Sequence, residues 1–142
     1  MNKLDKESII GISALLVHAA NIDENYTEQE KDLVKKFIKS YLKEDNENEI
    51  LERAEKIENN SNQLISYTNI IKQNSVDVKK DIIEHLWKIL ISDDTVDQFE
   101  SNLMRRICGL IYFSDKECAE IKLKLLNSRW LILLKMNVLN VN

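Results

Sequence analysis

The sequence carries one pattern twice, as LLVHAANIDENYTEQEKDLVKKFI at residues 15–38 and as HLWKILISDDTVDQFESNLMRRICGLI at residues 85–111. In each copy an apolar helix end is followed by a short loop that opens with an acid, and then by a helix that contains a Glu. When Asp23 is aligned with Asp93, Glu30 falls on Glu100. Five apolar pairs also coincide: Leu16 with Leu86, Ala19 with Ile89, Leu33 with Leu103, Val34 with Met104, and Phe37 with Ile107. The chain is therefore predicted to contain a duplicated helix–loop–helix corner.

The composition favours helices throughout. The 142 residues include no Pro and only two Gly, whereas a sandwich or barrel needs many turn residues. Apolar residues at helical spacing predict seven helices: residues 5–22, 27–41, 46–58, 63–72, 76–91, 97–111 and 114–127. We expect one all-α domain over residues 1–127, a helical bundle with a pseudo-twofold internal repeat, and an apolar C-terminal tail over residues 128–142.

Local signals place the helix starts and the core. In a capping box, a Ser or Thr side chain and a Glu three residues later satisfy each other's backbone N–H groups, and Thr27 with Glu30 has this pattern. Ser114 with Glu117 has the same pattern. The helix at 76–91 is apolar on almost every side in its C-terminal half, so we expect it at the centre of the core. The charged helix at 46–58 is expected on the outside.

Charge and cysteine content exclude several classes of protein. A net charge of −4 argues against nucleic-acid binding, because the Lys and Arg pairs are interleaved with acids. The N-terminus lacks the apolar core of a signal peptide, and no apolar run reaches the roughly 18 residues of a membrane span. Cys108 and Cys118 show neither metal-ligand spacing nor a disulfide framework. We expect a soluble cytoplasmic protein in which Cys108 is a buried thiol.

The acids of the two corners have both structural and functional explanations. Glu30 and Glu100 suit helix N-termini, where a carboxylate caps N–H groups and meets the positive end of the helix dipole. Asp23 and Asp93 follow helix C-termini, where a carboxylate is unfavourable by roughly 0.3–1 kcal/mol unless something compensates. Three features would each compensate for this cost. They are a turn in which the Asp accepts a backbone N–H, a bound cation, and a basic surface on a partner protein.

The candidate metal site consists of Asp23, Glu30, Asp93 and Glu100. Ligands that are all carboxylate oxygens favour Ca²⁺ or Mg²⁺ over Zn²⁺. The spacing is not that of an EF-hand, because in each copy the Glu follows the Asp without the central Gly of that loop.

Candidate catalytic residues lack the partners that catalysis requires. His18 and His85 are not at equivalent positions in the two copies of the repeat, and neither has a potential metal ligand one helical turn later in the chain. His85 follows Asp81 by four residues, which is an ordinary helix-surface pair. The sequence contains no nucleophile elbow, phosphate loop or dinucleotide fingerprint. We therefore expect no catalytic site, no cofactor-binding site and no enzymatic activity, and a hydrolase built on the clustered carboxylates is the least favoured alternative.

The segments VHAANIDENYTEQE and KILISDDTVDQFE, each at a helix–helix corner, resemble the tellurite-resistance TerB-like family. That family has an Asp at the end of one helix and a Glu in the next, in both halves of an all-α domain. The resemblance matches these positions to Asp23 with Glu30 and to Asp93 with Glu100, covers roughly residues 8–126, and is closest to small stand-alone bacterial members. It implies a role in tellurite resistance and stress responses, and metal binding by the acids.

Two functional hypotheses follow. The first is a non-enzymatic module that acts through contacts with a protein partner, tuned by a divalent cation at the acidic corners. The alternative is a structural or oligomerising protein that docks through the apolar run Trp130–Leu134. The sequence identifies neither the partner nor the oligomeric state.

Overall fold

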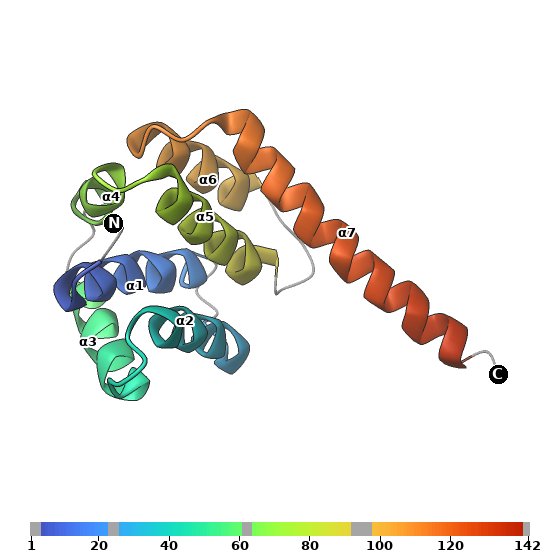
Figure 1. Cartoon of the computed structure of the whole chain (residues 1–142), viewed down its shortest axis with the longest axis horizontal. Coiled ribbons are helices and arrows are strands. Elements are labelled where there is room, and N and C mark those ends of the chain that lie inside the picture. The colour runs from blue at the N-terminus through green and yellow to red at the C-terminus, as the bar shows by residue number, and fades with distance from the viewer. Residues whose placement is uncertain (1–3, 23–25, 61–63, 92–97, 141–142) are drawn as a thin grey trace.

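The computed structural model is a helical bundle from which one long helix extends (Figure 1). It describes residues 4–22, 26–60, 64–91 and 98–140, without the side chains of residues 60, 64–66, 98–100 and 129–140. Within these ranges the elements are α1 (Lys6–Ala20), α2 (Glu28–Tyr41), α3 (Glu47–Asn60), α4 (Leu64–Lys72), α5 (Val76–Ile91), α6 (Gln98–Leu110) and α7 (Asp115–Asn140). The predicted all-α bundle is confirmed, and the first six predicted helices agree with the observed bounds within about two residues.

Helices α1 and α5 share the centre of the bundle. Ten of the fifteen residues of α1 are buried, and the helix packs against α2, α3, α4 and α5. Helix α5, which was predicted at the centre, packs against α1, α2, α4 and α7. Both helices are apolar on most sides, so each buries more than one face.

Helix α3 is less peripheral than predicted. It packs against α1 and α2, and its residues Ile50, Leu51 and Ala54 are buried. Ile57 is exposed. A short apolar stripe is therefore enough to attach a highly charged helix to the core.

The internal repeat is visible in the packing of two three-helix units. In the first unit α3 packs on α1, and in the second α7 packs on α5, while α4 connects the two units. Four of the five aligned apolar pairs are buried in both copies: Leu16, Ala19, Val34 and Phe37 in the first, and Leu86, Ile89, Met104 and Ile107 in the second. In the fifth pair Leu103 is buried and Leu33 is partly buried. The units differ in that α1 packs closely on α2, whereas α6 contacts mainly α4 and α7.

Helix α7 does not end at Asn127, as the sequence predicted, but continues to Asn140. Residues 128–140, which were predicted as a tail, are therefore the second half of one helix. Ile121, Leu125 and Leu126 pack against the core, and Figure 1 shows the rest of α7 extending away from the bundle toward the C-terminus. The helix continues because the segment contains no Pro or Gly and has four Leu together with an Arg, a Lys and a Met, which are strong helix formers.

Candidate functional site

Helix α2 begins with a complete capping box. The Glu30 N–H donates to Thr27 Oγ1 at 3.1 Å, and the Thr27 N–H donates to Glu30 Oε1 at 2.8 Å. The Thr27 hydroxyl lies 3.0 Å from the same carboxylate oxygen and donates to it. Glu30 is only 2% exposed. The predicted cap is confirmed, and it accounts for Glu30 without a bound cation.

The other acids of the candidate metal site fall outside what the structure describes. Asp23 and Asp93 lie outside the described residues, and Glu100 lies in α6 with its side chain outside them. Among the described side chains, no three His, Cys, Asp or Glu groups come together as ligands of one ion. The metal site thus stays a prediction of the sequence, and the one acid with a described environment serves as a helix cap.

A polar contact that the sequence did not predict holds the end of α1 against α3. Asn21 Nδ2 donates to Glu58 Oε2 at 3.2 Å, and His18 Nδ1 lies 3.4 Å from Glu58 Oε1. Glu58 is 9% exposed. It continues the buried stripe of Leu51 and Ala54 by one helical turn, so the helical period could have revealed it if a polar residue had been allowed on that stripe. His18 is therefore part of a contact between helices.

A second polar group joins α2 to α5. The Tyr41 hydroxyl donates to Asp81 Oδ2 at 2.6 Å, while His85 Nδ1 lies 2.8 Å from the Asp81 carbonyl oxygen and 3.5 Å from Asp81 Oδ1. Burial raises the pKa of Tyr41, and the hydrogen bond to Asp81 and the charge of Asp81 raise it further. The ring of Phe37 packs against the rings of Tyr41 and His85. The predicted pair of Asp81 and His85 is thus part of the packing between two helices.

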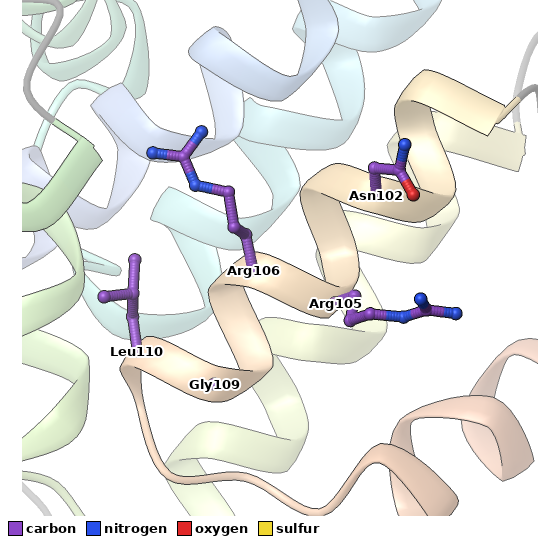
Figure 2. Close-up of a pocket in the computed structure, with 5 residues that line it drawn as sticks. All are labelled: Asn102, Arg105, Arg106, Gly109 and Leu110. Atoms are coloured by element: carbon purple, nitrogen blue, oxygen red, sulfur yellow. The ribbon is translucent and has the colours of Figure 1, made fainter.

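Helix α6 carries a surface groove of about 460 Å³, shown in Figure 2. Its lining residues are Asn102, Arg105, Arg106, Gly109 and Leu110. Figure 2 shows the side chains of Arg105 and Arg106 pointing away from each other. The two guanidinium groups therefore do not form a clamp around a single anion.

A second groove, of about 510 Å³, is lined by residues of α5, α6 and α7, among them Trp87, Met104, Cys118 and Lys122. Cys118 of α7 and Cys108 of α6 are both free and buried, and Cys118 is the one that lines this groove. The burial of Cys108 is confirmed. The sequence did not predict that the two thiols come together, because the turn between α6 and α7 determines their proximity.

The fold and these contacts define the class of protein: a helical module of two three-helix units, in which Glu30 caps a helix and Glu58 and Asp81 join neighbouring helices. A family model described as tellurite resistance protein TerB matches residues 10–123. The match covers well over half of the chain, and the chain belongs to the TerB family. The searches of curated proteins and of solved structures found no match.

The family match ends inside α7, so the second half of that helix lies beyond it. Despite its 26 residues, α7 does not combine the length and hydropathy that a membrane span needs, and neither does another helix in the described ranges. The extended half of α7 is thus the feature of this chain that its family membership leaves unexplained.

Proposed function

We propose that this chain is a non-enzymatic, cytoplasmic bacterial module of the tellurite-resistance and stress-response type, which acts through contacts with a protein partner. Membership of the TerB family supports the tellurite-resistance context. One observation carries the proposed contact: α7 continues as a single helix to Asn140 and extends away from the bundle (Figure 1). We assign the partner contact to this extended half.

The sequence of the extended half suits such a contact. Trp130–Leu134 is a run of five consecutive apolar residues. Successive positions in an α-helix are about 100° apart, so five of them encircle the helix axis. Whichever side of this segment is turned toward its own bundle, apolar positions remain on the other sides. Apolar segments of this kind are typical of binding sites, and a partner that covers apolar surface gains about 25 cal/mol per Å².

The roles of the described acids support a non-enzymatic function. Glu30 caps α2, Glu58 links α3 to α1, and Asp81 links α5 to α2. None of these three acids lines either groove along α6. Glu30 therefore stabilises the start of its own helix, and Glu58 and Asp81 hold helices together, which is what a binding module requires of its scaffold. Asp115 is the described acid that lines a groove.

A divalent cation at the corners is a separate prediction of the sequence. Ca²⁺ or Mg²⁺ bound at Asp23, Glu30, Asp93 and Glu100 would tune the affinity of the module for its protein partner. It is not needed for the contact through α7, and it has its own test in the Discussion.

Deletion of residues 128–142 tests the proposal in the cells that encode the chain. The deletion keeps Ile121, Leu125 and Leu126, which pack against the core, so the melting temperature should stay close to that of the full chain. We expect growth on tellurite to fall to the level of cells that lack the gene. The matched control is Lys116→Ala at the exposed base of the same helix, which should leave growth unchanged.

Unchanged growth of the truncated strain, with the truncated protein present and folded, would contradict the proposal. Light scattering on the full chain and on the truncated chain distinguishes contact with a different protein from contact with a second copy of this chain. An oligomer that is lost on truncation would assign the contact to self-association, the alternative function. If the full chain and the truncated chain are both monomers, the contact through α7 is with a different protein.

A further inference from the structure

The connection between α6 and α7 is a tight reversal of the chain. The Phe113 N–H donates to the Cys108 carbonyl oxygen at 2.9 Å. Tyr112 has a φ of 58°, the left-handed conformation that closes helix ends of this type. Helix α7 then starts at Asp115. The reversal brings the last turns of α6 against the first turn of α7.

This reversal places the thiols of Cys108 and Cys118 against each other, so that they share a hydrogen bond. Cys108 is 0% exposed and Cys118 is 5% exposed. The indole N–H of Trp87 donates to the Cys118 carbonyl oxygen at 3.1 Å and also to Cys118 Sγ at 3.3 Å. Zinc sites need three or four protein ligands, and no such cluster exists among the described side chains. A pair of thiols without further ligands suits a dithiol–disulfide couple better than a metal site.

The two thiols differ in acidity. The hydrogen bond from Cys108 lowers the pKa of Cys118, and burial opposes this shift. The Trp87 N–H and the positive charge of Lys122 lower the pKa further, while the negative charge of Asp115 raises it. The same hydrogen bond, and then burial, raise the pKa of Cys108. Cys118 therefore ionises first, while Cys108 keeps its proton and donates it in the hydrogen bond. A thiolate is the reactive form of a cysteine, which makes Cys118 the nucleophile of the pair.

Cys118 is also the thiol that solvent molecules can approach. It lines the groove of about 510 Å³ together with Met104, Ala119 and Lys122. The ammonium group of Lys122 lies 5.1 Å from the centroid of the Trp87 ring, so the indole and the positive charge lie at the same groove. The groove is large enough for a small peroxide.

We propose that Cys108 and Cys118 form a reversible intrachain disulfide when the protein meets a hydroperoxide. The Cys118 thiolate attacks one peroxide oxygen, so that an S–O bond forms, the O–O bond breaks, and the departing oxygen takes up a proton. The Cys108 thiol then attacks the Cys118 sulfenic sulfur, so that the S–S bond forms and water leaves with the Cys108 proton. In total the two sulfurs give two electrons to the peroxide, which ends as water and an alcohol, or as two waters.

The disulfide fastens the base of α7 to the end of α6. Its formation does not depend on the proposed protein contact, because the cysteines belong to the bundle and the contact is assigned to residues beyond 127. The experiment reads the covalent state of the chain, so its failure would leave the contact proposal untouched.

Intact-mass measurement of the wild-type chain after treatment with hydrogen peroxide tests this inference. We expect each chain to lose about 2 Da, and dithiothreitol to restore the original mass. Trypsin cleaves after Arg106, Lys116 and Lys122, so digestion without reduction should yield one species that joins residues 107–116 to residues 117–122.

Single-cysteine variants test the assigned order of reaction. In Cys108→Ser a hydroxyl donor replaces the thiol donor, the sulfenic acid at Cys118 has no thiol partner, and dimedone should trap it. In Cys118→Ala dimedone should leave Cys108 unlabelled. Unchanged mass of the wild-type chain, a disulfide between two chains, or equal trapping of both cysteines would overturn the proposal. The wild-type mass is decisive even if a variant fails to fold.

Discussion

Substitutions at Thr27 and Glu30 can measure whether the buried acid of the first corner acts as a helix cap. Thr27→Ala removes the hydroxyl oxygen that accepts the Glu30 N–H at 3.1 Å. The loss of such a cap costs about 1 kcal/mol. Glu30→Ala removes the carboxylate that accepts the Thr27 N–H at 2.8 Å. Hydrogen bonds to a charged group contribute about 1.5–3 kcal/mol, so the Glu30 substitution should cost more than the Thr27 substitution.

Because the two residues satisfy each other's backbone, their effects should not add. We expect the double variant to lose less unfolding free energy than the sum of the single variants, by about 0.5–1 kcal/mol. Urea unfolding, followed by far-UV circular dichroism in the presence of EDTA, gives these free energies without a contribution from divalent cations. Glu28→Ala is the matched control: its side chain is 83% exposed in the same helical turn, and its effect should stay within about 0.5 kcal/mol.

Additive costs for Thr27→Ala and Glu30→Ala would refute the capping argument. So would a cost of Glu30→Ala that exists only when Ca²⁺ or Mg²⁺ is added. The second result would assign Glu30 to a cation and favour the metal site.

The other predictions concern the corner acids and the partly buried phenol of Tyr41. If a divalent cation binds at the corners, millimolar Ca²⁺ or Mg²⁺ should raise the melting temperature, because a ligand that binds only the folded state stabilises it. Asp23→Asn combined with Asp93→Asn should abolish this rise, and no rise in the wild type would exclude the cation. The pKa of Tyr41 lies above its ordinary value of 10.0, so the unfolded chain loses this proton first. The stability that Tyr41 contributes is therefore complete below about pH 10 and is lost at higher pH. Urea midpoints should fall less steeply above pH 10 in Tyr41→Phe than in the wild type, and equal slopes would contradict the raised pKa.

Most of the fold could be predicted because its determinants are local. The capping box at Thr27 lies within four residues of sequence, and the helical period places the buried positions of each helix. The prediction that α7 ends at Asn127 was wrong, and the reason is equally local. Asn127 and Ser128 resemble a helix stop, but each costs only about 0.5 kcal/mol inside a helix, which the strong helix formers around them offset.

The side-chain contacts could not be predicted because they join distant segments. Asn21 and Glu58 are 37 positions apart, and Tyr41 and Asp81 are 40 positions apart. These hydrogen bonds form because α1 packs on α3 and α2 packs on α5. No short sequence motif predicts that packing. Cys108 and Cys118 are close in sequence, but they meet only because the chain reverses at Tyr112.

A photo-crosslinking amino acid at position 131 tests most directly whether the extended half of α7 makes the proposed contact. In cells grown with tellurite, we expect position 131 to yield one discrete crosslinked species, and position 116, exposed at the base of the same helix, to yield none. Mass spectrometry of that species identifies the partner or a second copy of the chain. No crosslink at position 131, or the same products from both positions, would contradict the account.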